Sequence, residues 1–293
     1  MTAQKPLVSI GLFTRNGART IARTLETLLS QTFSDFELVI SDNASTDDTE
    51  RVCRTYASRD PRIRYIRQEK GLSAAENQTF VVRASRGEYF MWASDDDLWA
   101  PKFVEILLEK LTKNQEYQVA MSSYDVVWSN GALKYHVLFT GDLDTTHQPY
   151  EAVFKKMLFD SPIHVFVYGL YRRDFLSKIM RRFPSCARPD RVLMCEVALS
   201  ARFYAVEPTL FFKVRADAPL VKREKYAGDP LQKAFADRFA NTRYFFTLLF
   251  WLLSSSVIPF ARKRFILPNW FRLIWRHKGM LYAEIKKAAA VRS

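Results

Sequence analysis

Apolar and polar positions alternate along the first hundred residues in blocks that predict strands and helices in turn. Short apolar runs rich in strand-forming residues occur at 7–13, 36–40, 64–67 and 88–93. Apolar side chains at helical spacing follow the first two runs, at 21–29 and 52–57. Strands and helices alternating at this length predict an α/β fold in which helices cover both faces of a largely parallel sheet.

The segments that directly follow these strands are the first candidates for chemistry. In open sheets of this kind, ligands bind outside the carboxyl ends of the strands. Those segments here are 14–17, 41–48 and 94–97. None contains GxGxxG or GxxxxGK[ST], which disfavours a dinucleotide-binding fold and a P-loop.

Three adjacent carboxylates, Asp95, Asp96 and Asp97, follow the fourth apolar run. Their mutual repulsion at the end of a buried strand is costly unless a cation offsets it. Mg²⁺ and Mn²⁺ take oxygen ligands, commonly one or two carboxylates together with substrate phosphates. The alternative is an acidic helix start ahead of Phe103, because Asp is favoured in the first turn of a helix.

Length and charge narrow the class of protein. At 293 residues, 48% of them apolar, the chain is long enough for one large α/β domain with an appendage. Its net charge of +13 is concentrated at one end, since residues 231–293 contain twelve Lys or Arg and two acids. No nucleic-acid-binding motif accompanies this basic segment, so we expect no nucleic-acid partner.

Cysteine usage and the first residues suggest where the protein works. Cys53, Cys186 and Cys195 are odd in number and lack CxxC spacing, which argues against a disulfide framework and a zinc site. The opening MTAQKPLVSI lacks the basic segment and apolar core of a secretory signal. We therefore expect a reducing compartment, the cytoplasm.

The motifs at the strand ends together resemble a known family. PLVSIGLFTRNGARTIARTLETLLSQTFSDFELVISDNASTDDT and RGEYFMWASDDDLWAP resemble the inverting family 2 glycosyltransferases, which have the GT-A fold; the similarity runs from about Pro6 to Pro101 and continues more weakly to about Arg215. The resemblance implies a GT-A-like, mostly parallel sheet flanked by helices. It also implies a nucleotide-diphosphate sugar donor, with a UDP-sugar as first choice, a Mg²⁺ or Mn²⁺ cofactor, and an acceptor hydroxyl.

The resemblance carries over to the first two strand ends. Phe13 and Arg15 fall where the family's first strand meets the nucleotide. Asp42 and Asn43 fall where an Asp-Asp pair often contacts the base and ribose, and Asn43 departs from the commoner acid. Core packing remains the alternative for Phe13, and a turn or helix cap is the alternative for Asp42.

The metal motif of the family usually reads Asp-x-Asp-Asp, and this chain has Ser94, Asp95, Asp96 and Asp97. Ser94 therefore stands in place of the first acid. The resemblance implies Asp96 as the metal ligand and Asp95 as a contact to the ribose or behind the metal. After FFKVR the family frequently has a His that helps hold metal or diphosphate, and this chain has Ala216 and Asp217 instead.

Inverting transfer needs a base that removes the proton of the acceptor hydroxyl. By resemblance this base is Asp190, which precedes a predicted apolar helix, although Pro189 stands where the family often has an acid. An N-cap is the structural alternative for Asp190. Glu196, nearly two turns further along, is the reserve base, and otherwise a solvated or paired residue. We expect His136 and His164 to be packing residues in apolar surroundings.

We divide the chain into a catalytic domain, 1–225, and a basic, aromatic-rich helical tail, 226–293. Residues 244–261 carry no charge and reach the lower limit for spanning a bilayer, but three serines and Pro259 interrupt them. Cations interleave with aromatics beyond this segment, as in helices that lie in a membrane interface. Three hypotheses follow: contact with an anionic membrane surface, packing on the catalytic domain or in a homodimer, or a span.

With this resemblance, we expect a metal-dependent inverting glycosyltransferase, peripheral on the inner face of the membrane, that modifies a glycan or lipid-linked acceptor in cell-envelope or exopolysaccharide synthesis. Two rivals come from other classes. A nucleotidyltransferase would use the same metal site, but Arg15 and Arg19 alone offer little to bind a triphosphate. A non-catalytic membrane-associated relative would explain why Ser94 replaces an acid.

Overall fold

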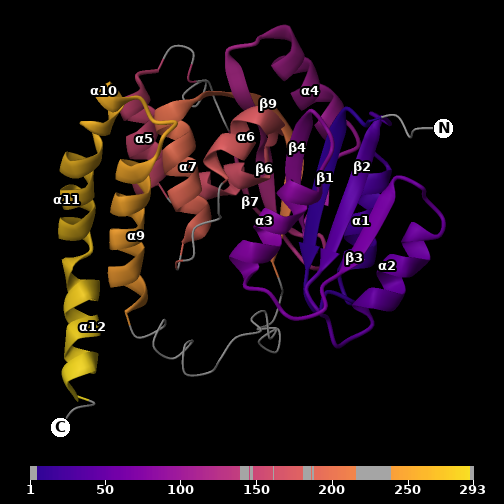
Figure 1. Cartoon of the computed structure of the whole chain (residues 1–293), viewed down its shortest axis with the longest axis horizontal. Coiled ribbons are helices and arrows are strands. Elements are labelled where there is room, and N and C mark those ends of the chain that lie inside the picture. The colour runs from indigo at the N-terminus through magenta and orange to yellow at the C-terminus, as the bar shows by residue number, and fades with distance from the viewer. Residues whose placement is uncertain are drawn as a thin grey trace.

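A computed structural model describes residues 5–138, 145, 148–160, 162–180, 186, 188–215 and 239–290. Its centre is a nine-stranded sheet of order β3-β2-β1-β4-β8-β6-β9-β5, with β7 paired to β6. Helices flank this sheet, and the last helices form a layer at one end of the molecule, far from β1 to β3 (Figure 1). The predicted fold class, a GT-A-like α/β fold, is confirmed.

The first half of the sheet is parallel, as predicted. It consists of β1 (Val8–Thr14), β2 (Phe36–Asp42), β3 (Ile63–Arg67) and β4 (Tyr89–Ser94). In register, Phe13 of β1 lies opposite Ser41 of β2 and Ser94 of β4. The polar segments after these three strands therefore leave the sheet at the same edge.

Three helices connect the parallel strands: α1 (Ile21–Leu29), α2 (Thr49–Ala57) and α3 (Ala74–Ala84). In α1 the apolar side chains recur at helical spacing and Ile21, Leu25 and Leu28 are fully buried. A capping box begins α3, because Ser73 and Glu76 each accept a hydrogen bond from the other's backbone N–H.

The second half of the sheet is mixed. It adds β5 (Leu98–Trp99), β6 (Tyr117–Trp128), β7 (Leu133–Val137), β8 (Leu170–Arg172) and β9 (Arg202–Arg215). β8 runs antiparallel to β4 and β6, whereas β9 runs parallel to β6. The short β5 pairs with the end of β9, Leu98 opposite Phe212, so the acidic segment just before β5 lies beside residues 213–215.

Among the described residues, the body of the molecule has five more helical segments: α4 (Phe103–Lys113), α5 (Tyr150–Phe159), the 3-10 helix η2 (Pro162–Tyr168), α6 (Arg173–Ile179) and α7 (Pro189–Ser200). The central residues of α7, Val192 to Leu199, are all buried, which is the mark of a helix covered on every side. Its neighbours are α5, η2, β9 and, on its outer side, α9 (Ala240–Ser254).

The C-terminal layer continues from α9 with α10 (Phe260–Lys263), α11 (Ile266–Arg276) and α12 (Lys278–Ala290). Figure 1 shows α9 between α7 and the outermost pair, α11 and α12. The uncharged segment 244–261 is not one helix, because α9 ends at Ser254 and α10 begins at Phe260. In the described ranges, no helix is both long and apolar enough to cross a bilayer. The expected domain boundary at 225 lies outside the described residues.

Polar contacts tie this layer to the body of the molecule. The indole N–H of Trp251 donates to the carboxylate of Glu196 on α7 at 2.6 Å. Arg262 donates to the Leu199 carbonyl at 3.0 Å, and its guanidinium carbon lies 3.3 Å from the centre of the Tyr150 ring. Packing of the tail on the catalytic body, one of the three hypotheses, is therefore present in the structure.

Replacing Leu248 with alanine should lower the free energy of unfolding by about 2–4 kcal/mol, because this α9 side chain is 1% exposed and its loss leaves a cavity. Phe250→Ala, on the exposed side of the same helix, should change that free energy by less than about 0.5 kcal/mol. Urea unfolding measures both values. Equally small effects in the two variants would contradict the packing of α9.

Candidate active site at the strand ends

Asp42, the last residue of β2, has a fully buried carboxylate that several donors surround. One oxygen accepts the backbone N–H of Ser45 at 2.9 Å, and the other accepts the Tyr65 hydroxyl at 2.7 Å and the Arg67 guanidinium at 3.3 Å. The turn alternative is therefore confirmed: Asp42 closes the turn after β2. The same contacts fix the Asp42 carboxylate at the edge of the sheet where the strands end.

Asn43 uses its side chain to fasten a second loop to this edge. Its amide oxygen accepts the Leu72 N–H at 2.6 Å, and its amide N–H₂ donates to the Leu72 carbonyl at 2.9 Å. A carboxylate could not make the second bond because it has no proton to donate. This two-way bond gives a physical reason for Asn at a position where the resemblance suggested an acid.

Phe13 and Arg15 lie at the end of β1 beside these loops. Phe13 is half-buried and packs against the core, as its alternative predicted. Arg15, also half-buried, donates to the Asn43 carbonyl at 2.7 Å. Phe13, Arg15, Asp42 and Asn43 thus lie together at the ends of β1 and β2, where the Arg15–Asn43 hydrogen bond joins the two strand ends.

The three acidic residues after β4 have different surroundings. Asp95 is buried and accepts the Thr14 hydroxyl at 2.6 Å, which ties the ends of β4 and β1 together. Asp96 is the most exposed of the three. The acidic helix start is wrong as an explanation, because β5 intervenes and α4 begins only at Phe103, with Lys102 as its N-cap.

Asp97 is fully buried and paired with a lysine that the sequence analysis did not single out. The Lys213 ammonium, near the end of β9, donates to its carboxylate at 2.6 Å. The Ser94 hydroxyl and the Val214 N–H donate as well, the latter at 3.0 Å. Burial lowers the pKa of Lys213, but the Asp97 carboxylate and its neighbours outweigh this and raise it, so the ammonium stays charged. The Lys213 ammonium therefore offsets part of the carboxylate repulsion, for which the sequence predicted only a metal ion.

Asp190 occupies the first turn of α7, behind Pro189. The N-cap is Arg188, so the N-cap alternative for Asp190 is wrong. Burial raises its pKa to about 6, and the nearby Lys213 charge acts in the opposite direction. A carboxylate with such a pKa is mainly ionised at neutral pH and is a stronger base than an exposed one.

Tyr168, at the end of η2, lies within electrostatic range of both the acidic cluster and Asp190. Its pKa is raised by burial and by the charges of Asp97, Asp190 and Asp96, so all three carboxylates lie within electrostatic range of this hydroxyl. The Lys213 ammonium is 5.1 Å from the centre of its ring. The only sequence signal for Lys213 was a cation inside the apolar run LFFKVR.

Several other predicted residues lie elsewhere. Glu196 is buried and paired with Trp251 of α9, as its structural alternative stated, and burial raises its pKa. The apolar setting expected for His136 is wrong: the ring is 55% exposed and its Nδ1 lies 2.7 Å from Asp125 Oδ1. The His164 side chain and Asp217 lie outside the described residues.

The surroundings of Asp96 fit a divalent cation held mainly by a substrate. In the part of the chain that the structure describes, no group of three or more His, Cys, Asp or Glu side chains could hold a metal by itself. Mg²⁺ and Mn²⁺ are commonly bound by one or two carboxylates plus phosphate oxygens. Asp96 is the acid of the cluster most open to such a partner.

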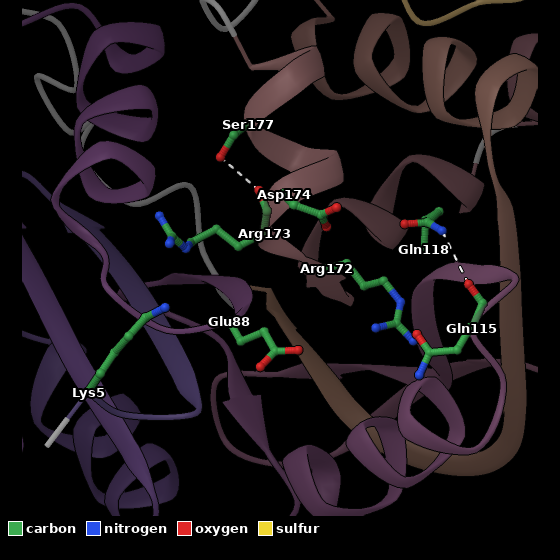
Figure 2. A pocket seen from close by; sticks show the side chains of 8 residues that line it. All are labelled: Lys5, Glu88, Gln115, Gln118, Arg172, Arg173, Asp174 and Ser177. Atoms are coloured by element: carbon green, nitrogen blue, oxygen red, sulfur yellow. Dashed lines mark hydrogen bonds between the residues drawn. The ribbon is translucent and has the colours of Figure 1, made fainter.

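A cavity of about 550 Å³ lies away from these residues, beside the starts of β4 and β6 (Figure 2). Arg172, one of its lining residues, donates to the Tyr117 carbonyl at 2.9 Å and also to the Leu111 carbonyl. Its guanidinium is thus used to join β8 to α4 and β6. This cavity shares no residue with the candidate site.

The chain is similar in sequence to known proteins. The family model described as Glycosyl transferase family 2 matches residues 9–180. Chondroitin synthase of Escherichia coli is 39% identical over 110 residues, which are 37% of this chain and 16% of that protein. Glycosyltransferase GlyG of Streptococcus pneumoniae is 24% identical over 131 residues, 45% of this chain and 44% of that protein. The chain thus matches less than half the length of either relative.

Two solved structures share the fold. S. aureus TarS, crystallised with UDP-GlcNAc, has a TM-score of 0.67 at 16% identity, and the match covers 92% of this chain and 72% of that one. The mannosyltransferase PcManGT from Pyrobaculum calidifontis, solved with GDP-Man and Mn²⁺, has a TM-score of 0.55 at 16% identity. That match covers 99% of this chain and 81% of the neighbour.

The raised pKa of Asp190 predicts a dependence of stability on pH. Because its pKa is about 6 in the folded chain and 3.8 ordinarily, the ionised carboxylate costs folding free energy that is absent below pH 3.8 and complete above about pH 6. Asp190→Asn should therefore raise the free energy of unfolding by about 1–3 kcal/mol at about pH 8 and change it little near pH 4.

Chemical unfolding at the two pH values measures this difference. Asp174→Asn is the matched control, since Asp174 also lies in the first turn of a helix, α6, but its side chain is 73% exposed. The control should change stability by less than about 0.5 kcal/mol. A destabilised Asp190→Asn protein at high pH would contradict the raised pKa of this half-buried carboxylate.

Proposed function

This chain belongs to glycosyl transferase family 2, whose model matches more than half of its length, and on that premise we propose that it is an inverting glycosyltransferase using a nucleotide-diphosphate sugar. The observation that carries the proposal is that Asp96, Asp97 and Asp190 all lie within electrostatic range of Tyr168, whose ring contacts the Lys213 ammonium. Such a transfer requires two parts: an acidic cluster that suits a metal–diphosphate unit, and a carboxylate with a raised pKa.

The donor in this proposal lies against the ends of β1 and β2. Asp42 and Asn43 shape the wall for the nucleoside, Phe13 and Arg15 flank it, and Asp95 lies on the side of the ribose. Binding of UDP-GlcNAc by TarS and of GDP-Man by PcManGT supports a nucleotide sugar as the ligand class. A UDP-sugar is our first choice.

Asp96 is the residue proposed to hold Mg²⁺ or Mn²⁺ together with the donor diphosphate. When bound, the cation offsets the negative charge that builds on the departing diphosphate. The Mn²⁺ in the PcManGT structure supports a divalent cation at this fold. Asp97 keeps Lys213 beside this position, so a fixed positive charge faces the same region.

Asp190 is proposed to take the proton of the acceptor hydroxyl. The acceptor oxygen then forms its bond to the anomeric carbon while the bond from that carbon to the diphosphate oxygen breaks, and the electron pair leaves with the nucleoside diphosphate. One displacement from the opposite side inverts the configuration. Asp190 holds the transferred proton, which its pKa near 6 allows it to release to water.

The acceptor is proposed to be a glycan or lipid-linked hydroxyl in cell-envelope or exopolysaccharide synthesis, by analogy with the family. Cys53, Cys186 and Cys195 are free thiols in the structure, which supports work in a reducing compartment such as the cytoplasm.

Donor and metal binding can be tested together by thermal shift. UDP-GlcNAc and GDP-Man, each with and without Mn²⁺, should raise Tm where they bind the native state. Asp96→Asn should remove the Mn²⁺-dependent part of the shift, whereas Asp174→Asn, which changes an exposed carboxylate on α6, should keep it. A full Mn²⁺-dependent shift in Asp96→Asn would show that the metal is held elsewhere. Consumption of nucleoside triphosphates instead of sugar nucleotides would favour a nucleotidyltransferase.

Asp190→Asn should keep the donor-induced thermal shift but lose transfer by about 10²–10⁴-fold, because the amide cannot accept the proton. In the unchanged protein, kcat/KM should fall below about pH 6, as Asp190 becomes protonated. Glu196→Gln is the comparison variant, since Glu196 contacts the tail. Transfer that survives in Asp190→Asn but is lost in Glu196→Gln would assign the base to Glu196.

A further inference from the structure

The outer side of the helical tail exposes two stripes of large apolar side chains. On α9, Phe246 is 47% exposed and Phe250 64%, with Leu253 one turn further along. On α11, Phe271 is 62% exposed and Trp275 72%, with Leu267 one turn before them. Residues three or four apart share one side of a helix, so each helix presents a continuous apolar stripe.

The two stripes form one surface, which we call the aromatic face: Phe246, Phe250, Leu253, Leu267, Phe271 and Trp275. Ring contacts connect them, since the Phe246 centroid lies 5.9 Å from that of Trp270 and the Trp270 centroid lies 5.1 Å from that of Phe271. Figure 1 shows α9 and α11 side by side at the end of the molecule. Contiguous exposed apolar surface of this kind marks an interaction site.

The exposed charges of the described tail have one sign. Exposed cations on the tail are Arg243, Arg264, Arg272, Arg276, Lys278 and Lys286. The single acid of residues 239–290, Glu284, is buried, where it accepts the backbone N–H groups of Asn241 at 2.8 Å and Thr242 at 3.1 Å at the start of α9. The Lys278 ammonium lies 3.9 Å from the Trp275 ring centre, so cation and aromatic share the same surface.

We infer that the aromatic face binds the surface of an anionic lipid bilayer. Aromatic rings suit the boundary between headgroups and acyl chains, and the flanking cations attract the phosphates of anionic lipids. A second copy of this chain fits less well, because a two-fold contact would bring like-charged cations together.

Docking would also bring the candidate site toward the bilayer, a consequence that rests on the proposed function. The helix that carries Asp190, α7, packs directly on α9 through Glu196 and Trp251. The Arg188 guanidinium carbon, two residues before Asp190, lies 5.2 Å from the centre of the Tyr244 ring. The helix that carries the base thus packs directly on a helix of the membrane-binding layer, which favours an acceptor attached to a lipid over one free in solution.

Vesicle co-sedimentation of the full chain tests the binding. It should sediment with phosphatidylcholine vesicles that contain phosphatidylglycerol and not with phosphatidylcholine alone, and added salt should weaken this binding. The double variant Phe271→Ser, Trp275→Ser should bind at least about tenfold less, and so should the triple variant Arg272→Gln, Arg276→Gln, Lys278→Gln. The control Leu133→Ser, Tyr135→Ser removes two exposed apolar side chains on β7 and should bind normally.

Each other outcome has a definite meaning. Failure to sediment with anionic vesicles at low salt, or equal binding to both vesicle types, would overturn the inference. A dimer that Phe271→Ser, Trp275→Ser converts to a monomer would assign the face to a second copy. An unchanged Tm shows that the variants are folded, and an unchanged donor-induced shift separates this test from the proposed function: vesicle binding without transfer would reject the glycosyltransferase proposal alone.

Discussion

The buried ion pair between Asp97 and Lys213 is the interaction on which the site most depends. It joins the segment after β4 to the end of β9, two parts of the chain separated by more than a hundred residues. Burying two charges is costly unless further polar groups complete their bonding, and here Ser94 and the Val214 N–H do so. Ser94 departs from the family's acidic motif, but it still contributes to the site, because its hydroxyl donates to this ion pair.

The same lysine opposes the effect of burial on the pKa of the candidate base. Burial alone would raise the pKa of Asp190 further, and the positive charge of Lys213 holds it to about 6. Lys213 in turn stays charged because the Asp97 carboxylate raises the pKa of the lysine. One ion pair thus reduces the repulsion in the acidic cluster and keeps the base mainly ionised near neutral pH.

The C-terminal layer makes the position of Asp190 depend on the tail. A helix buried on all sides needs a cover, and α9 supplies it with Tyr244, Leu248 and Leu252 facing inward. The opposite sides of α9 and α11 remain apolar and are bordered by cations. Packing on the body and binding to a membrane are therefore compatible, because they use different sides of the same helices.

The sequence by itself determined the parallel half of the sheet and the residues at its edge. The alternation of apolar runs identified β1 to β4, and the rule that ligands bind at carboxyl ends selected the segments 41–48 and 94–97, because both signals are local in the chain. The resemblance to the family then pointed to Asp42, Asn43 and Asp96 within them. Only the tertiary structure revealed the partners: Lys213 for Asp97, Leu72 for Asn43 and Trp251 for Glu196. These contacts join residues far apart in the chain, and a periodic pattern shows which side of a strand or helix is buried without saying what covers it.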